Sequence, residues 1–400
     1  MTASPGETDK TATSSLDAPT VLFRTINHVG IISLNRPTAL NALDLSMIHQ
    51  IAEKLEECRS RDDIGAVVLH SSIEKAFCAG GDVRALIRPG SDSRANIERY
   101  FTDEYRLDYA IHQFPKPVVV LMDGVTMGGG MGLAQGASLR VATDRSKIAM
   151  PETKIGLVPD VGATHFLSVM PVELELYVGL TGITLSGTDA VACGLADICI
   201  PHRIIGGFED RIADIDTHAI SKGLHSFDAW LAAMRGIFEV EVLGIEAAPV
   251  MRCREWIEAH FKPDRAPQEI LSSLKRTLAQ GIEDTSDLTE NAELRAWLET
   301  TLAALTQYSP TMIHVTREAL LRGRQMTLAE CFRMEMGIVI RSIEEGDFRE
   351  GVRAHLVDKD RNPKWQVGDL SDVTSERVQA FMTSPWQIHP LVGLETIAHV

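Results

Sequence analysis

The feature that most constrains the fold is a short apolar strand that opens into a glycine-rich loop, because the chain contains this pattern twice. Residues 65–70 (GAVVLH) lead to residues 79–82 (AGGD), and residues 117–122 (PVVVLM) lead to the triple glycine at 128–130. A short apolar run bounded by turn residues predicts a buried strand. Glycines after a strand let a ligand approach the backbone and leave amide hydrogens free to bind it. The pattern therefore predicts an α/β fold with layered sheets.

The segments around these loops extend the same α/β pattern. Residues 21–25 and 29–34 are β-rich runs around an Ile-Asn-His turn and predict a hairpin. Asp44 can cap a helix, because apolar residues recur at helical spacing directly after it. The remaining expected elements are a helix over 96–114, a small-residue helix after the triple glycine, and short strands over 140–143 and 147–150.

The second half of the chain becomes helical and more polar from about residue 209. Amphipathic patterns cover residues 227–240, 267–280, 290–305 and 327–345. Ser309 followed by Pro310 is typical of a helix start. We expect four regions: a disordered tail over 1–20, an α/β core over 21–205, a helical region over 206–308, and a C-terminal helical region over 309–400.

Composition limits the classes of partner. A formal net charge of −16 argues against broad nucleic-acid binding, which needs a basic surface. An anionic ligand must then be held by local donors, for which Arg36, Lys75 and Arg84 are candidates. No stretch approaches 18 consecutive apolar residues, so no membrane span is expected.

Cysteine spacing and the N-terminal segment predict the compartment. The six cysteines form no CxxC pair and no Cys/His metal spacing, so we expect reduced thiols and no metal site. The first nineteen residues lack an apolar core and contain no arginine, so they fit neither a secretory signal nor a transit peptide. The expected location is therefore the cytoplasm.

The two glycine loops can bind an oxygen atom that carries negative charge. The second loop precedes a helix, and partial positive charge at a helix N-terminus favours an oxyanion. One amide from each loop can hold the oxygen of a thioester carbonyl. The alternative is that each glycine run is a packing or turn device. The triple glycine is not the dinucleotide fingerprint, because the sixth position is Leu133.

A third loop, over residues 149–162, carries two carboxylates after prolines, Glu152 and Asp160. Two acids close together on a rigid loop can divide acid and base roles if their pKa values differ. The alternative is that Glu152 begins a helix and Asp160 makes a turn bond. Residue types alone leave both interpretations open.

Taken together and in this order, the motifs resemble the enoyl-CoA hydratase/isomerase (crotonase) superfamily over roughly residues 21 to 205. The matching motifs are LNRP at 34–37, NAL at 41–43, AFCAGGD at 76–82, the triple glycine, and MPE at 150–152. The resemblance implies a spiral of strand-strand-helix units, followed here by a mostly helical C-terminal half.

The chain is more similar still to the 3-hydroxyisobutyryl-CoA hydrolase branch of that superfamily. In that branch Gly-x-Thr-Met precedes the triple glycine, as at 124–127, and Pro-Asp-Val-Gly follows Met-Pro-Glu-Thr, as at 159–162. A late signature matches FREGVRA at 348–354, DKD at 358–360 and PKW at 363–365. Between about 205 and 308 the resemblance is weak.

The resemblance implies a role for individual residues. It assigns the oxyanion amides to Gly81 and Gly129, the catalytic glutamate to Glu152, and the second acid of the hydrolase branch to Asp160. Two further residues would contact substrate: Glu104 matches a substrate-contacting acid, and Arg84 would meet the phosphates of coenzyme A.

One departure from the hydratases distinguishes the activities. Hydratases carry a second glutamate where this chain has Gly132, and that glutamate helps to place and activate water. The resemblance therefore implies hydrolysis of a short branched 3-hydroxyacyl-CoA, 3-hydroxyisobutyryl-CoA from valine breakdown. Coenzyme A is then part of the substrate, and no separate cofactor is expected. The alternatives are a hydratase or isomerase on the same fold and a non-catalytic acyl-CoA-binding protein; self-association through the C-terminal helices stays open.

Other nucleophile and base candidates are less favoured. Cys78 has no activating histidine nearby in sequence, and a small cysteine is usually a buried core residue. His165 follows the Asp160 loop, but a lone histidine is more often structural. No Gly-x-Ser-x-Gly motif exists, so a serine nucleophile on an elbow turn is not supported.

Overall fold

Two sheets form the core of the computed structural model, which describes residues 19–217, 226–280 and 288–395. The larger sheet has the strand order β1-β2-β3-β5-β7-β9, and the smaller has the order β4-β6-β8. The strands are β1 (Val21–Ile26), β2 (Val29–Leu34), β3 (Ala66–Ser71), β4 (Ala76–Cys78), β5 (Val118–Met122), β6 (Val125–Met127), β7 (Leu139–Thr143), β8 (Lys147–Ala149) and β9 (Ile198–Ile200).

Successive strands alternate between the two sheets, and this alternation builds the predicted spiral. β3, β5 and β7 lie in the large sheet, and the strands that directly follow them, β4, β6 and β8, lie in the small sheet. Apart from the antiparallel hairpin β1–β2, the paired strands are parallel. Parallel strands point in the same direction, so the loops that follow their carboxyl ends meet at one edge of the sheet.

The helices of the first part of the chain follow the strands as expected. They are α1 (Leu45–Ser60), α2 (Val83–Leu86), α3 (Arg94–His112), α4 (Gly129–Gln135), α5 (Ala163–Phe166), α6 (Val172–Thr181) and α7 (Gly187–Ala192). Asp44 caps α1 by accepting a hydrogen bond from the Met47 amide at 2.9 Å. Ser93 caps α3, so this helix begins before the predicted start at residue 96.

Everything described after β9 is helix, turn or extended connection. The α-helices are α8 (Phe208–Ala213), α9 (Phe227–Phe238), α10 (Pro249–Arg252), α11 (Arg254–His260), α12 (Pro267–Gln280), α13 (Leu288–Gln307), α14 (Pro310–Gly323), α15 (Leu328–Glu344), α16 (Phe348–Val352) and α17 (Ser375–Met382). Ser309 caps α14 through the Met312 amide, as the sequence predicts.

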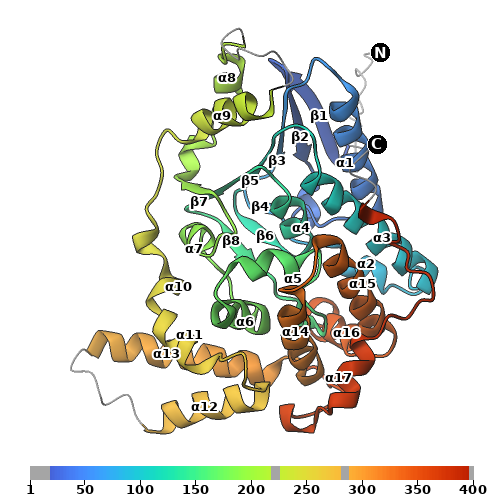
Figure 1. Cartoon of the computed structure of the whole chain (residues 1–400), viewed down its shortest axis with the longest axis vertical. Helices are drawn as coiled ribbons and strands as arrows, with labels where there is room; N and C mark the ends of the chain where they lie inside the picture. Colours follow the sequence, from blue (N-terminus) through green and yellow to red (C-terminus); the bar gives the residue numbers. More distant parts are fainter. Residues whose placement is uncertain (1–18, 218–225, 281–287, 396–400) are drawn as a thin grey trace, which may run out of the picture.

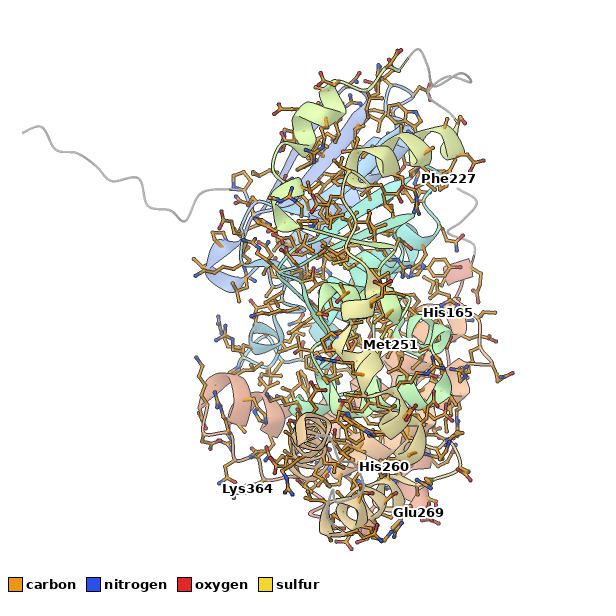
Figure 2. The ribbon with its side chains drawn as sticks, turned by 90° about the vertical axis from the view of Figure 1, so that its left-hand side faces the viewer. His165, Phe227, Met251, His260, Glu269 and Lys364 are labelled. Atoms are coloured by element: carbon orange, nitrogen blue, oxygen red, sulfur yellow. The ribbon has the colours of Figure 1, made fainter. Side chains whose placement is uncertain are left out.

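These later helices pack back onto the α/β core in two groups. α8 and α9 lie at the sheet end of the molecule, whereas α11 to α13 lie at the opposite end (Figure 1). Figure 2 shows the same separation, with Phe227 near the top and His260 and Glu269 near the bottom. α9 buries Trp230 and Phe238 against the large sheet. α14 packs on α6, and α15 packs on α3 and α5.

The main expectations for the fold are confirmed, including the hairpin and the layered α/β core. The strands β4, β6 and β9 were not predicted, because a three-residue strand is too short to show a period. The predicted tail over 1–20 lies almost wholly outside the described residues. Within the described part of the chain, no helix is long and apolar enough to cross a membrane.

Candidate active site

A cavity of about 840 Å³ lies between the glycine loops, the acidic loop and the C-terminal half. It brings together five of the six residues singled out in the sequence. Its lining includes Gly81, Glu104, Gly129, Glu152 and Asp160. Residues from three separate loops and from α3 therefore face one space, although they span almost eighty positions of the sequence.

The two glycine loops touch each other at this cavity. A Cβ atom added to Gly129 would lie 3.4 Å from the amide nitrogen of Gly81. Gly80 has φ +102° and Gly128 has φ +49°, conformations that favour glycine, so each loop turns sharply just before Gly81 or Gly129, the residues that line the cavity. Gly129 is the first residue of α4, where an amide has no acceptor within the helix.

Neither of the two amides is hydrogen-bonded within the part of the chain that the structure describes. Among the described residues, no backbone or side-chain acceptor is hydrogen-bonded to the Gly81 or Gly129 amide. The adjoining backbone is held in place, because Leu43 donates to the Gly80 carbonyl at 2.8 Å and Asp82 donates to the Leu43 carbonyl at 2.7 Å. The result is a rigid pair of free donors, which is the geometry that stabilises an oxyanion.

Glu152 begins a short 3₁₀ helix (Glu152–Ile155) after Pro151, as the structural alternative foresaw, and its side chain also lines the cavity. The side chain is buried, and Oε2 has no hydrogen-bond partner among the described residues. Burial raises the pKa of Glu152 well above its usual value, and the charge of Asp160 raises it further. A buried, unpartnered carboxyl group that faces a cavity is a candidate for proton transfer.

Asp160 is held by a tyrosine that the sequence analysis did not single out. The Tyr105 hydroxyl donates to Asp160 Oδ2 at 2.5 Å. Burial raises the pKa of Asp160 to about 6, although the tyrosine hydrogen bond opposes this shift. The hydrogen bond from Tyr105 opposes the shift at Asp160 and not at Glu152, so the environments of the two acids differ, as divided acid and base roles require.

Glu104 lies on α3, and its carboxyl group lies close to the second glycine loop. A Cβ atom added to Gly129 would lie 2.5 Å from Glu104 Oε1, which has no hydrogen-bond partner among the described residues. Burial raises the pKa of Glu104 well above its usual value, and the charge of Asp160 adds to this effect. Burial thus favours the uncharged form of Glu104 at the point where the two loops meet.

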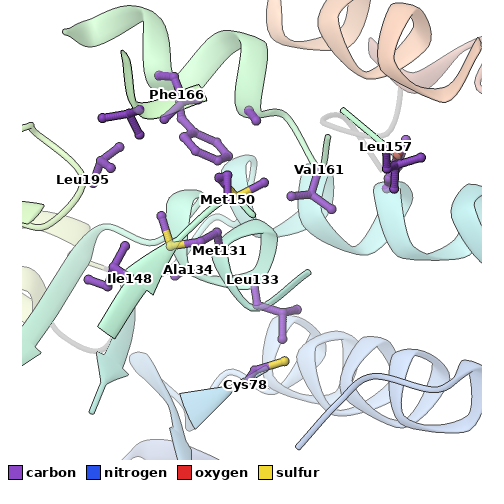
Figure 3. Packing of buried hydrophobic residues seen from close by; sticks show 14 of the residues in the cluster. Cys78, Met131, Leu133, Ala134, Ile148, Met150, Leu157, Val161, Phe166 and Leu195 are labelled. Atoms are coloured by element: carbon purple, nitrogen blue, oxygen red, sulfur yellow. The ribbon is translucent and has the colours of Figure 1, made fainter. Parts of the chain in front are cut away.

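The space beside Gly132 is taken by a further buried acid, Asp108. A Cβ atom at position 132 would lie 2.5 Å from Asp108 Oδ2 and 2.8 Å from the Val161 Cβ atom. Figure 3 shows Val161 beside α4, which carries Met131 and Leu133. Position 132 therefore lacks both a carboxylate and the room for one. Asp108 could have been found from the sequence, because it lies one helical turn after Glu104 on the same face.

Arg84 lies outside the central cavity. It lines an adjoining groove of about 780 Å³ that shares Leu356 with the cavity. The groove carries five cationic side chains: Arg36, Arg84, Arg88, Arg353 and Lys359. Arg36 is paired with Asp82, and Arg353 with three acids of its own segment. The other three cations have no ion pair or hydrogen bond among the described residues, which leaves them able to bind an anion.

The helical region over 206–308, where the resemblance to the family is weak, also lines the cavity. The end of α13 contributes Thr300, Thr301, Ala304 and Gln307, and Tyr308 follows it. The segment after α16 contributes His355, Leu356, Arg361 and Pro363. Pro363 belongs to the PKW signature at 363–365, whereas no local motif in the sequence marks the other residues of this part of the lining.

Neither of the two remaining nucleophile and base candidates lines the cavity. Cys78 is fully buried, and burial raises the pKa of its thiol to about 12, so it is not a thiolate at neutral pH. His165 is half-buried and is not among the residues that line the cavity. Among the described residues, no group of three or more His, Cys, Asp and Glu side chains is arranged to hold a metal ion.

The alternating strands and the cavity between two glycine loops define the crotonase class of α/β proteins. The sequence pattern of the enoyl-CoA hydratase/isomerase family matches residues 29–382. The chain belongs to that family.

Its characterised relatives carry two kinds of name. The chain is 34% identical over 372 residues to "3-hydroxyisobutyryl-CoA hydrolase, mitochondrial" of Danio rerio. This alignment covers 93% of this chain and 91% of that protein. It is 32% identical over 365 residues to "3-hydroxyisobutyryl-CoA hydrolase 1" of Arabidopsis thaliana, covering 90% of each. It is also 35% identical to "Small ribosomal subunit protein mS47" of Neurospora crassa, covering 88% of this chain and 69% of that protein.

A solved structure confirms the fold over nearly the whole chain. The crystal structure of a carnitinyl-CoA dehydratase from Mycobacterium thermoresistibile aligns with a TM-score of 0.78 and 32% identity. The alignment covers 93% of this chain and 98% of that one, so the helical half is shared as well.

Proposed function

We propose that this protein hydrolyses the thioester of a short branched 3-hydroxyacyl-CoA, with 3-hydroxyisobutyryl-CoA as its substrate. One observation carries the proposal: Glu152 and Asp160 line the same cavity as two free amides, while position 132 has no room for a second glutamate. The names of the Danio rerio and Arabidopsis thaliana relatives support the choice of substrate.

The amides of Gly81 and Gly129 would hold the thioester oxygen. As the carbonyl carbon becomes tetrahedral, negative charge develops on this oxygen, and two preorganised donors stabilise it in the transition state. No residue has to move, because the backbone hydrogen bonds around Leu43 already fix the first loop.

Glu152 would act on the carbonyl carbon by one of two routes. In the first, it takes a proton from water while the water oxygen bonds to the carbon. In the second, its own oxygen bonds to the carbon and forms an anhydride that water then cleaves. In both routes the carbon–sulfur bond breaks, the sulfur leaves with the bonding electrons and takes up a proton, and the products are the free acid and coenzyme A. Asp160 would orient the attacking group or carry the proton.

The remaining contacts would position the substrate. Glu104, whose uncharged form is favoured by burial beside the second glycine loop, can exchange hydrogen bonds with the 3-hydroxyl group of the acyl chain. The unpaired cations Arg84, Arg88 and Lys359 would face the phosphates of coenzyme A in the adjoining groove. These local donors compensate for the net charge of the chain, which would repel the anion.

Thiol release from a panel of acyl-CoA esters tests the proposal, alongside loss of enoyl absorbance from crotonyl-CoA. We expect the fastest thiol release from 3-hydroxyisobutyryl-CoA and slow hydration of crotonyl-CoA. Hydration faster than hydrolysis would favour a hydratase or dehydratase activity, like that for which the aligned crystal structure is named. Tight binding of coenzyme A without turnover of any ester would show a non-catalytic acyl-CoA-binding protein.

A further inference from the structure

A buried carboxyl group from the C-terminal half reaches the loop that carries Asp160. Glu335 lies in the middle of α15 and has no exposed surface. Its Oε2 accepts a hydrogen bond from the Gly162 amide at 2.7 Å. Its Oε1 accepts from the Thr164 amide at 2.8 Å and from the Thr164 hydroxyl at 2.6 Å. All three donors follow Asp160 within four residues.

Burying the Glu335 side chain costs free energy of folding, which indicates that this side chain has a specific role. Removing a carboxylate from water is unfavourable unless donors replace the lost solvation. Glu335 has three such donors, but all belong to the loop, so α15 itself gains nothing from them. An apolar residue at this point would suit a buried helix at least as well.

The loop needs an external support because its backbone is strained. Val161 has φ +55° and Gly162 has φ +86°. The left-handed region is unfavourable for a β-branched residue such as valine, so the loop would relax if it were not held. The strained residue directly follows Asp160, and relaxation there would turn the carboxyl group of Asp160 away from its present direction.

The same helix supports Asp160 from a second side. Phe332, one turn before Glu335, packs its ring against that of Tyr105 with 5.4 Å between centroids. Tyr105 is the residue whose hydroxyl donates to Asp160. Figure 1 shows α15 beside α5 and α3, the elements on which these contacts are made.

We propose that Glu335 is a positioning residue that fixes Asp160 for catalysis by holding the strained backbone that follows it. Glu335 does not line the cavity, so it is not placed to contact a substrate bound there. The inference rests on the proposed role of Asp160, so its test combines a measurement of the loop with a measurement of turnover.

The measurement of the loop is amide hydrogen exchange in wild type and Glu335→Gln. The glutamine keeps one oxygen for Thr164 but turns an NH₂ group toward the Gly162 amide, which is also a donor. We expect exchange over residues 157–166 to become about tenfold faster or more, since a lost hydrogen bond raises the population of the open loop. Unchanged exchange over this segment would overturn the inference whatever reaction the protein catalyses.

The measurement of turnover is a comparison of two backgrounds. In the wild-type background, Glu335→Gln should lower kcat about ten- to a hundredfold, because a displacement near 1 Å can cost this much, with KM almost unchanged. In the Asp160→Asn background the same substitution should lower kcat less than about twofold, because Glu335 acts only through Asp160. An equal loss in both backgrounds, or no loss in wild type, would overturn the inference.

Asp189→Asn is the matched control. Asp189 is also buried and accepts three hydrogen bonds, from the Ser186 amide at 2.9 Å, the Ser186 hydroxyl at 2.8 Å and the Val250 amide at 2.7 Å. The Asp189→Asn variant should lower the melting temperature as much as Glu335→Gln does, but leave kcat and amide exchange over residues 157–166 unchanged. If kcat falls equally in this control, Glu335 has only a general structural role. If wild type releases no thiol, the proposed function fails, and hydrogen exchange alone still decides whether Glu335 holds the loop.

Discussion

Glu152 is the residue on which the proposed chemistry depends most directly. Its carboxyl group is buried, faces the cavity and lacks a partner for Oε2 among the described residues. We expect Glu152→Gln to lower kcat by about two to four orders of magnitude, the range for a lost acid-base or nucleophilic group, with little change in the affinity for coenzyme A. Thiol-release kinetics and calorimetric titration with coenzyme A measure the two effects. Near-normal turnover would remove Glu152 from the mechanism.

Asp108 provides a contrasting substitution on the same acidic cluster. Both of its oxygens are buried without a hydrogen-bond partner among the described residues. Burial raises the pKa of Asp108 well above its usual value and so favours the uncharged form, and the neighbouring Glu104 carboxyl adds to this shift. Asparagine has the same shape and no charge, so Asp108→Asn should change kcat by less than about threefold and leave the melting temperature unchanged or higher. A large loss of turnover would show that Asp108 takes part in proton transfer.

The pair formed by Glu152 and Asp160 should determine how kcat/KM depends on pH. Burial raises both pKa values, that of Asp160 to about 6. Because hydrolysis needs an ionised carboxylate, kcat/KM should fall as the pH drops through the raised pKa, giving an acid limb at about pH 6 or above instead of near 4. Asp160→Asn removes a negative charge that raises the pKa of Glu152, so the limb of its residual activity should move to lower pH. A limb that does not move would show that the two acids titrate independently.

At the scale of the element, the start of α4 offers a test of the oxyanion site. Gly129→Pro removes the amide hydrogen at the first helical position, where proline is tolerated. Gly129→Ala adds the same Cβ atom close to Glu104 but keeps the amide, so it is the matched control. We expect kcat of the proline variant to be about a hundredfold or more below that of the alanine variant. Equal kcat values in two folded variants would show that this amide does not bind the oxyanion.

The elements also show what the sequence could predict and what it could not. Long periodic segments were predictable, since α12 has the bounds 267–280 that its amphipathic pattern indicates. The glycine loops and the loop with Glu152 were predictable because their motifs are local. Tyr105 and Glu335 were not, because each acts through a contact with a residue far away in the sequence, such as the 173 positions between Gly162 and Glu335. Such a pairing has no local pattern.

At the scale of the whole molecule, the helices after residue 205 cover the core. Trp230 on α9 is fully buried, and its ring lies directly on Gly65, before β3. The division of the chain into a core and helical regions stays a prediction of the sequence. Packing of this kind nevertheless indicates that the sheet and α9 unfold together.

Trp230→Ala tests this packing. It should lower the free energy of unfolding by about 3–5 kcal/mol, the usual cost of a large cavity. Urea unfolding followed by near- and far-ultraviolet circular dichroism should show one transition at lower urea for both signals. Two separate transitions, with only the helical signal shifted, would indicate that α9 belongs to an independent unit.

The contact between α15 and the Asp160 loop has a consequence for the order in which the protein matures during synthesis. Both glycine loops and both acids of the proposed pair leave the ribosome long before Glu335, which follows Gly162 by 173 residues. Chains fold from the N-terminus as they emerge, so the α/β part can assemble first with the Asp160 loop unsupported. An unfinished chain would then carry both glycine loops and both acids but no support for Asp160, and full turnover would begin only after α15 and the segment that follows it have been made.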